Sequence, residues 1–377
     1  MKITFLCGSL EPGRDGVGDY TRKLAIELIR NGHQVGIVAL NDKHLKSKFN
    51  GLQQLEGFDI PVLRVASNEI PAKRFHQASS WIDDFGPDWL SLQFVPFSFH
   101  TKGLAFGLGK LLEGLGKEKR WHIMVHELWV GMEKGAPLKF VCWGWLQKQL
   151  IGSLFSRLQP AVVHTQTDLY MKMLAQMGFT VQHLPLFGNI EKARIDSENG
   201  SAYLPASGIS KNISFVVFGG IHPGAPISQL AKELKFYGTT NNVKVEMRMI
   251  GRCGYEQESW KKACEAAGLL VKVLGEQSPE HISHVLTNSS FGISTTPTAL
   301  IGKSGSVAAM QEHGLPVLCV SRLWQPRGFV DPKLPDGIMR YKEGQIQDFI
   351  TRSRSGIAPR VNVTVIARQF VNSLLSV

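Results

Sequence analysis

Short apolar runs alternate with amphipathic segments along the first half of the chain, as in a parallel sheet whose strands are joined by helices. The clearest helix is expected over residues 19–30, where four apolar side chains share one face and Asn31-Gly32 ends it. Buried strands are expected at residues 2–7, 33–40, 89–94, 121–125, 161–164 and 181–186.

The same alternation begins again in the second half of the chain. Strands are expected at residues 213–218, 243–250, 271–274, 291–294 and 316–320. Helices are expected at residues 226–234, 257–267 and 279–286, and a last one at 363–375. Ser278 is expected to cap the third of these helices, with Pro279 in its first turn.

Residues 195–212 interrupt the pattern, because they are rich in Ser, Gly, Asn and Ala and contain one proline. We therefore expect an α/β protein with an N-terminal Rossmann-like domain in residues 1–194 and a linker in 195–212. A C-terminal Rossmann-like domain is expected in 213–345, followed by a helical segment in 346–377. In such sheets a ligand binds at the carboxyl ends of the strands, and with two domains it is expected in the cleft between them.

Charge narrows the classes of partner. The chain of 377 residues has a formal net charge of +11, with the larger part of the excess in residues 201–377. This charge fits an anionic small ligand, an anionic membrane surface or nucleic acid. Because no dense basic run with interleaved aromatic residues occurs, no nucleic-acid partner is expected.

The cysteines and the apolar runs indicate the compartment. The five cysteines are scattered and form no Cys-x-x-Cys pair, so neither a disulfide framework nor a zinc site is expected. No apolar run reaches the roughly 18 residues of a membrane span. A cytoplasmic protein with reduced thiols is expected.

One loop of the second half has the composition of a phosphate site. Gly302, Lys303, Ser304 and Gly305 follow an expected strand and precede an expected helix. Backbone N–H groups at a helix start converge on one point, the helix dipole adds partial positive charge, and Lys303 adds a full charge. It is not a P-loop, because the upstream glycine of that motif would fall at Pro297. The alternative is that Gly305 merely starts a helix and Lys303 is a solvated surface charge.

Four stretches of the chain together resemble family 4 of the retaining, nucleotide-sugar-dependent glycosyltransferases, which have the GT-B fold. They are GVGDYTRKLAIELIRNGHQVGIVAL at residues 16–40, HIMVHELWVG at 122–131, VQHLPLFGNIE at 181–191, and a region at 249–317 that contains GRCG and HGLPV. The resemblance implies two Rossmann-like parallel-sheet domains that face a central cleft, with the acceptor in the first and the donor in the second. It also implies a C-terminal helix that crosses back to the first domain, a nucleotide-diphosphate sugar as co-substrate, and neither cofactor nor metal.

The chain departs from this family at the donor. The family's Glu-x7-Glu pair falls on Ile301 and Ala309, so both carboxylates are missing. The family's Arg and Lys after the first strand of the second domain are also missing, and His222 is the only ionisable side chain in that segment, GGIHPGAPIS at 219–228. We expect Lys303 to take over the stabilisation of the leaving diphosphate, together with Arg252 and nearby amides. The expected donor-binding residues are His222, Arg252, Glu276, Gly302, Lys303, Ser304 and Gly305.

The resemblance also implies roles for residues of the first domain. His126 is expected to contact the donor sugar or the acceptor hydroxyl, and Glu127 to act as acceptor base or sugar ligand. Gly16, Gly18 and Asp19 are expected to approach the donor phosphates or the acceptor. Structural roles stay open for all five, as a strand-end histidine, a surface acid, and a helix start that Asp19 caps.

Acceptor choice is expected to lie in loops of the first domain, such as residues 43–69 and 95–107. Residues 138–158 combine aromatic and aliphatic side chains with three basic ones, so they could lie on a membrane that holds a lipid-linked acceptor, or form an ordinary core helix. The protein would then work at the inner face of the membrane. His281 and His284 are interpreted as a chance pair rather than a metal site.

The hypothesis that follows is a hexosyltransferase that moves a sugar from a nucleotide-diphosphate sugar to a sugar or glycan acceptor, with retention of configuration. Two alternatives stay open. A GT-B nucleotide-sugar epimerase or phosphorylase-like enzyme would need no separate sugar acceptor. A degenerate transferase would bind a nucleotide sugar or glycan without turnover, which the missing carboxylate pair favours.

Overall fold

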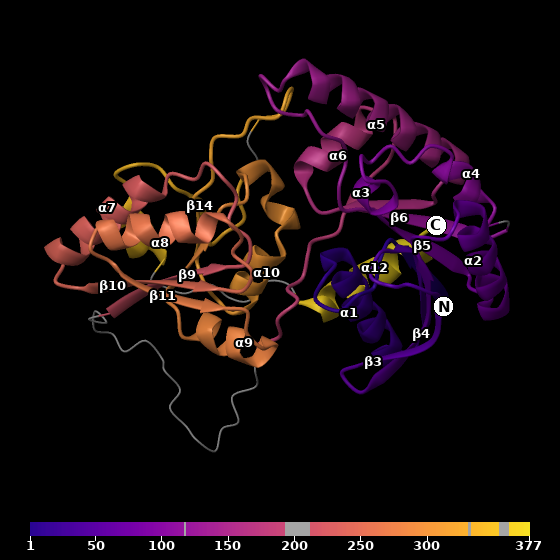
Figure 1. Ribbon diagram of the computed structural model, residues 1–377, viewed down its shortest axis with the longest axis horizontal. Coiled ribbons are helices and arrows are strands. Elements are labelled where there is room, and N and C mark those ends of the chain that lie inside the picture. Colours follow the sequence, from indigo (N-terminus) through magenta and orange to yellow (C-terminus); the bar gives the residue numbers. More distant parts are fainter. Residues whose placement is uncertain (117, 193–211, 331–332, 354–361) are drawn as a thin grey trace. The chain divides into compact units, whose positions relative to one another are not determined.

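The computed structural model describes residues 1–377 apart from 117, 193–211, 331–332 and 354–361. The chain divides into two compact units, each built around its own sheet (Figure 1). Unit 1 comprises Met1–Pro185, Pro326–Phe329 and Val363–Val377, and unit 2 comprises Leu186–Gln325 and Val330–Asn362. All but the last residue of the expected linker, 195–212, lies outside the described residues.

The chain enters unit 2 directly after Pro185, before the position at which composition placed the end of the first domain. The reason is local packing. Ile190 lies in an apolar cluster of unit 2, and the backbone N–H of Gly188 donates to the Glu312 carboxylate at 2.6 Å. Residues 186–190 are therefore the first part of unit 2 rather than the last part of unit 1.

In unit 1 the described strands form one sheet of eight, in the order β3-β4-β2-β1-β5-β6-β7-β8. The strands are β1 (Lys2–Cys7), β2 (Gln34–Asp42), β3 (Phe49–Leu55), β4 (Phe58–Ala66), β5 (Trp89–Phe94), β6 (Arg120–Val125), β7 (Val162–Thr165) and β8 (Gln182–His183). The helices are α1 (Gly16–Arg30), α2 (Pro71–Phe85), α3 (Pro96–Phe99), α4 (Leu108–Glu113), α5 (Leu138–Leu158), α6 (Asp168–Ala175) and α12 (Val363–Leu375). The central strands are buried along nearly their whole length, as expected for a parallel sheet covered on both faces.

The hairpin of β3 and β4 corrects an expectation, because residues 43–69 were treated as a loop. β3 is antiparallel to β4 at the edge of the sheet, and β4 runs parallel to β2. Sequence reasoning missed β3 because the strand is polar and half exposed, with Asn50, Gln53 and Gln54 in its seven residues. An edge strand of this kind lacks the continuous apolar run that reveals a central one.

In unit 2 the described strands form a sheet of six, all parallel, in the order β11-β10-β9-β12-β13-β14. The strands are β9 (Asn212–Phe218), β10 (Lys244–Ile250), β11 (Leu270–Gly275), β12 (Phe291–Ser294), β13 (Val317–Cys319) and β14 (Ile338–Arg340). The helices are α7 (Ile227–Thr240), α8 (Glu256–Ala266), α9 (Pro279–Thr287), the short 3₁₀ helix η2 (Thr298–Lys303), α10 (Gly305–Glu312) and α11 (Ile346–Arg352). As predicted, the Ser278 hydroxyl caps α9 by accepting from the N–H of His281, with Pro279 in the first turn.

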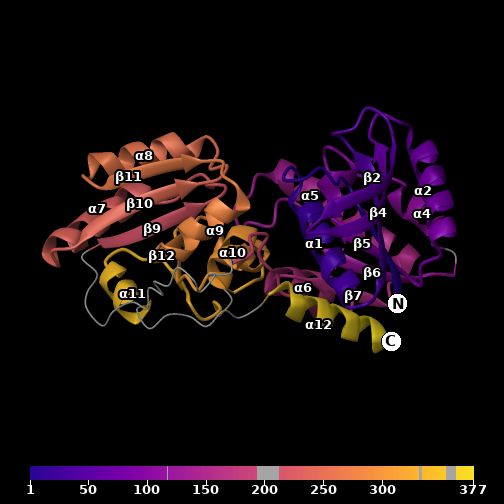
Figure 2. The same cartoon turned by 90° about the horizontal axis from the view of Figure 1, so that it is seen from below.

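Helix α12 follows unit 2 in the sequence but packs in unit 1, beside α1 (Figure 2). Phe370 is fully buried, and its ring stacks on that of Phe5 with 5.9 Å between centroids. Ile366 and Leu374 are buried on the same face of the helix. The spacing of these three side chains on one face therefore accounts for where α12 packs.

Each sheet has a switch point, where the strand order changes direction. In unit 1 it lies between β1 and β5, and in unit 2 between β9 and β12. In open parallel sheets a ligand binds at the carboxyl ends of the strands beside such a point. The loops after these four strands are therefore the first places to examine for a site.

No helix among the described residues is long and apolar enough to cross a membrane.

Candidate functional site

The switch point of unit 2 is closed by hydrogen bonds between the loops after β9 and β12. The backbone N–H of His222 donates to the Thr295 hydroxyl at 2.8 Å, and Nδ1 of the same histidine lies 3.1 Å from that oxygen. Thr295 is buried, whereas His222 is exposed. The threonine therefore fixes this exposed histidine at the carboxyl ends of β9 and β12.

Lys303 supplies positive charge beside His222. Partial desolvation first, and then the charge of Lys303, lower the pKa of His222 below its ordinary value. His222 is thus neutral at neutral pH and can offer hydrogen bonds, while the lysine is the cation. The sequence predicted both as ligands of a diphosphate, and the structure brings them together.

The start of α10 lies next to Lys303 and carries a cluster of hydroxyl groups. The Ser304 hydroxyl caps the helix by accepting from the N–H of Val307, and it also lies 3.2 Å from the hydroxyls of Thr296 and Ser306. A Cβ built on Gly305 would meet nothing within 4 Å, so the backbone there is open. Gly302 lies in η2, directly before Lys303. A hydroxyl cluster with an open helix start is suited to receive phosphate oxygens.

A second cation was missed by sequence reasoning. Arg322 follows β13, and its side chain packs on the loop after β9, with Cδ 3.4 Å from a Cβ built on Gly224. Gly224 has a positive φ of 79°, which favours glycine and lets the arginine approach closely. The only available signal was the position of a basic residue just beyond an expected strand.

Arg252 and Glu276, both predicted at the donor, lie at neighbouring strand ends and pair with each other. The Arg252 Nε donates to the Glu276 carboxylate at 2.7 Å, and both side chains are largely exposed. A surface pair of this kind contributes little stability. Its members can separate at low cost when a ligand competes for either of them.

The positions of the missing carboxylates are apolar and buried. Ile301 in η2 is 6% exposed, and Ala309 in α10 is fully buried. Both belong to one apolar cluster of unit 2. A Cβ built on Gly188 would lie 2.8 Å from Cα of Ala309, so the backbone at Gly188 packs directly on the backbone of α10 at this position. Both side chains are therefore part of the apolar core of unit 2.

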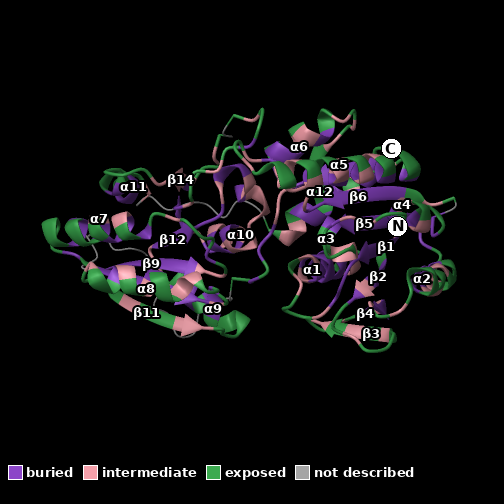
Figure 3. Cartoon of the chain, turned by 45° about the horizontal axis from the view of Figure 1, so that its top comes forward, coloured by how far each residue is buried: buried purple, intermediate pink, exposed green. Residues whose placement is uncertain are grey.

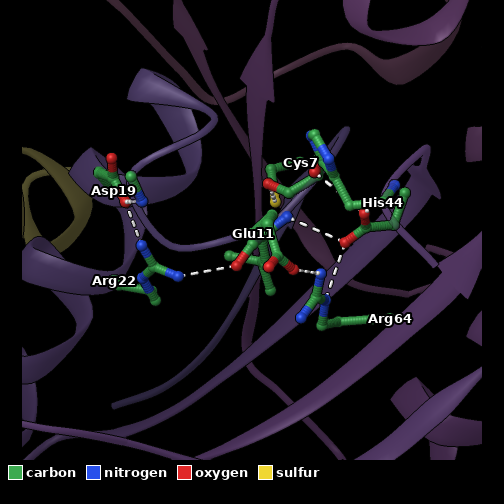
Figure 4. A network of polar contacts seen from close by, with 10 residues as sticks. Cys7, Glu11, Asp19, Arg22, His44 and Arg64 are labelled. Carbon is green, nitrogen blue, oxygen red and sulfur yellow. Dashed lines mark hydrogen bonds and ion pairs between the residues drawn. The ribbon is translucent and has the colours of Figure 1, made fainter.

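In unit 1 the loop after β1 is fixed by Asp42, a buried carboxylate that pairs with Arg64, which Figure 4 labels. Asp42 accepts from the Ser9 hydroxyl at 3.1 Å and the N–H of Leu10 at 3.1 Å, and from Nε of Arg64 at 2.8 Å. Burial alone would raise the pKa of Asp42, but the hydrogen bonds from Arg64 and the backbone outweigh it and lower the pKa. The loop at this switch point is thus rigidly anchored by an ionised group.

The first turn of α1 differs from what was predicted. The helix begins at Gly16 rather than residue 19, and Asp15 caps it by accepting from the N–H groups of Val17 and Gly18. Asp19 is not the cap, since its carboxylate accepts from the N–H of Gly13 and from Arg22. Because Asp15 already accepts from those two N–H groups, fewer N–H groups of the first turn are left to bind an anion than the composition suggested.

Gly18 is needed for packing, because a Cβ there would lie 2.6 Å from the carbonyl oxygen of Ser9. A Cβ on Gly16 would meet nothing within 4 Å, so that position is open to solvent or to a ligand. The two glycines therefore differ, and the structure gives a packing reason for only one of them.

His126 directly follows β6 and is 6% exposed. Its Nε2 lies 3.0 Å from Oε1 of Gln93, and its ring stands edge-on to Tyr20 of α1 with 5.0 Å between centroids. Glu127 follows and is half-buried. The structure thus places His126 against Tyr20, which directly follows the first turn of α1.

Within each unit the expected residues fall into small groups. Unit 2 gathers His222 with the 302–305 loop, and separately pairs Arg252 with Glu276. Unit 1 places His126 near the start of α1. Among the described residues no group of three or more His, Cys, Asp or Glu side chains is arranged to hold a metal ion.

No protein-family model and no curated protein sequence matches this chain. Solved structures do resemble it over its whole length. HepE from Anabaena, solved in complex with UDP and glucose, has a TM-score of 0.63 at 17% identity, with 100% of both chains covered. The catalytic domain of starch synthase IV from Arabidopsis thaliana, bound to ADP and acarbose, has a TM-score of 0.57 at 12% identity, covering 100% of this chain and 99% of that one.

An enzyme of another class shares the architecture. The UDP-GlcNAc 2-epimerase from Neisseria meningitidis, bound to UDP-GlcNAc, has a TM-score of 0.50 at 12% identity, with 100% of both chains covered. At these identities the likeness is one of fold. The two parallel-sheet units predicted from sequence are confirmed, and the chain has the GT-B fold.

Proposed function

We propose that the protein is a glycosyltransferase that moves a sugar from a nucleoside-diphosphate sugar to a sugar or glycan acceptor, with retention of configuration. The observation that carries the proposal is the group at the β9/β12 switch point, where His222, Lys303 and the hydroxyls around Ser304 converge. Hydroxyls, an open helix start and a lysine are the groups that bind a diphosphate. HepE and starch synthase IV, which share the fold, are solved with UDP and ADP.

The chemistry required is stabilisation of the negative charge that develops on the departing diphosphate. We propose Lys303, whose charge acts on His222, for this task, together with Arg322, which packs on the loop after β9. A charge-assisted hydrogen bond to phosphate contributes roughly 1.5–3 kcal/mol. In unit 1, His126 and Glu127 are proposed to contact the transferred sugar or the acceptor hydroxyl. Arg252 and Glu276 lie at the ends of β10 and β11 and are proposed to contact the nucleoside.

The first test is thermal unfolding with UDP, GDP, ADP, dTDP and CDP and their sugars. A ligand at a hundred times its dissociation constant, bound only to the folded state, stabilises by about 2.7 kcal/mol. Lys303→Ala should weaken binding of the active nucleotide roughly tenfold or more, because each 1.4 kcal/mol is a factor of ten. Lys262→Ala, an exposed lysine of α8, is the matched control. Equal nucleotide binding by wild type and Lys303→Ala would show that this loop does not bind the diphosphate.

Turnover separates the competing functions. A transferase converts the donor when an acceptor is supplied, and NMR of the product shows whether the anomeric configuration is retained. Interconversion of the donor sugar without an acceptor would instead identify an epimerase, the class that the Neisseria neighbour represents. Nucleotide binding without conversion of any donor would identify a binding protein, in keeping with the buried Ile301 and Ala309.

For the acceptor, we propose a lipid-linked glycan at an anionic membrane surface. Helix α5 is exposed along part of its length (Figure 3). It has no acidic residue and carries Lys139, Lys148 and Arg157. Its side chains Leu138 and Trp145 are 81% and 62% exposed. Phe140 and Trp143 stack with 6.0 Å between centroids. Aromatic and aliphatic side chains interspersed with lysine are suited to the interface of an anionic bilayer.

Unit 1 also contains a pocket of about 220 Å³ between α4, α5 and residues 103–109. Apolar side chains such as Leu108, Leu150 and Leu154 line it, with Lys110 and Arg157 among them. Phe106, in the loop beside the pocket, is 65% exposed. This composition suits part of an amphipathic anionic lipid.

Co-sedimentation with vesicles tests the membrane contact without any donor. Wild type should bind phosphatidylglycerol vesicles at low salt. Its binding should be weak with phosphatidylcholine vesicles, and weak with phosphatidylglycerol vesicles at high salt. The double variant Leu138→Gln/Trp145→Gln should lose binding, whereas Tyr255→Gln, equally exposed but in unit 2, should keep it. No binding by wild type, or equal binding by all variants, would exclude α5 as a membrane surface.

A further inference from the structure

A continuous string of hydrogen bonds runs through the core of unit 1, from His126 at the end of β6 to helix α12. Its members are His126, Gln93, Ser91, His122, His164, Ser373 and the carbonyl oxygen of Gln369, with donor–acceptor distances of 3.0, 2.9, 2.7, 3.0, 3.2 and 3.0 Å. The first five side chains are buried. Each hydroxyl and each neutral imidazole carries a single proton, so each donates to one neighbour in the string and accepts from the other. All members must therefore donate either towards α12 or towards His126.

The far end of the string selects the direction. A carbonyl oxygen can only accept, so the one hydroxyl proton of Ser373 goes to Gln369. Ser373 must then accept from His164, which therefore carries its proton on Nε2 and accepts at Nδ1. Burial lowers the pKa of His164 to about 4, and it lowers the pKa of His122 well below the ordinary value, so both rings are neutral near pH 7.

The direction then passes from ring to ring towards β5. His122 donates from Nε2 to His164, so its Nδ1 accepts from the Ser91 hydroxyl. Ser91 in turn accepts from the amide nitrogen of Gln93. The amide oxygen of Gln93 is thereby turned to His126, and because that oxygen can only accept, Nε2 of His126 must carry a proton.

We propose that Gln93 is a positioning residue that holds His126 in its Nε2–H tautomer, so that Nδ1 is the nitrogen with which His126 accepts a hydrogen bond or a proton from a substrate hydroxyl. The tautomer is set by the string within unit 1, and only the identity of the hydroxyl rests on the proposed function. Second partners that fix the tautomer of a functional histidine are a general device in proteins. Here the device extends across three strands, β5, β6 and β7, to a helix that follows unit 2 in the sequence.

The experiment is NMR of protein labelled with ¹⁵N only in histidine, without substrate. The ring nitrogens of His126 are assigned by comparison with His126→Gln. Wild type should show Nε2 protonated and Nδ1 unprotonated above the titration of the ring. Gln93→Met, which can neither donate nor accept through an amide, should give a mixture of both tautomers. Gln93→Glu should restore the Nε2–H form, because a carboxylate can only accept.

A variant on α12 tests the direction from the far end. Ser373→Ala removes the hydroxyl that fixes the string, so the Nδ1 and Nε2 signals of His164 should show both tautomers. Ser376→Ala, a neighbouring hydroxyl that donates to the carbonyl of Ser373, is the matched control and should leave them unchanged. A wild-type His126 protonated on Nδ1 alone, or a tautomer that persists in Gln93→Met, would overturn the proposal. Neither measurement needs a sugar donor or a sugar acceptor. The proposal about the tautomer can therefore fail while the proposed function stands, and the proposed function can fail while the proposal about the tautomer stands.

Discussion

Lowering the pH should destabilise unit 1 through its buried histidine pair. His122 and His164 are fully buried, their rings lie 5.1 Å apart between centroids, and burial lowers both pKa values. The unfolded chain binds a proton on His164 below its ordinary pKa of 6.5, whereas the folded chain does so only near pH 4. Since the unfolded state binds more protons in this window, the free energy of unfolding falls as the pH falls.

The size of the effect follows from the shift. Each pKa unit corresponds to about 1.4 kcal/mol, so His164 should contribute a loss of about 3 kcal/mol by pH 4 and about 2 kcal/mol between pH 7 and pH 5. His122 acts in the same direction. The Asp42 carboxylate, whose pKa is lowered from 3.8, loses its contribution only at more acidic pH.

Urea unfolding at pH 7, 6 and 5 measures this loss. Hydrogen exchange of peptides from β6 and β7, read by mass spectrometry, reports on unit 1 separately from unit 2. His164→Gln removes the titration but keeps a side chain that can accept from His122 and donate to Ser373. The wild type should lose about 2 kcal/mol more than this variant between pH 7 and pH 5. Identical pH dependence in the two proteins would show that His164 is protonated in the folded state and that the reasoning is wrong.

Three further substitutions test the fold around the candidate sites. Asp42→Ala leaves the buried Arg64 without its carboxylate and should lower the free energy of unfolding by roughly 3–5 kcal/mol, measured by urea titration; a loss below 1 kcal/mol would contradict the anchoring role. Ala309→Glu puts a carboxylate where the structure has no exposed surface, so it should lower the melting temperature without tightening nucleotide binding, and a gain in affinity would show that the position reaches the ligand. Ser278→Ala removes the cap of α9 and should cost about 1 kcal/mol in thermal unfolding of unit 2, whereas an unchanged melting temperature would argue against the cap.

The fold was largely predictable because its central strands are continuous apolar runs. Phe291–Ser294 is a strand over the residues predicted, and α5 spans the residues of the predicted segment 138–158. In the hairpin at the edge, β3 was not predicted because it is polar and half exposed. Strand β4 is mostly buried, but Asp59, Pro61 and Arg64 interrupt its apolar run. Strand and helix patterns report burial, so elements that are half exposed leave a weaker pattern in the sequence.

The candidate site was predictable only in part. Lys303 and Ser304 lie beside a helix start, a place that local sequence can reveal. Arg322 follows β13 and packs on Gly224 in the loop after β9, and no local sequence pattern predicts a contact between segments so far apart. The capping of α1 by Asp15 rather than Asp19 depends on backbone angles that composition does not encode. Residues brought together by the switch point are visible only once the strand order is known.

The placement of α12 has a consequence for how the chain acquires its structure during synthesis. Unit 1 is discontinuous, since residues 363–377 complete it only after all of unit 2 has left the ribosome. The buried Phe370 and the hydroxyl of Ser373 are then missing from the core of a chain that already contains all eight described strands of the first sheet. Domains usually fold in the order in which they are made. Here unit 2 can reach its final structure first, while the nascent unit 1 exposes the apolar surface that α12 will cover.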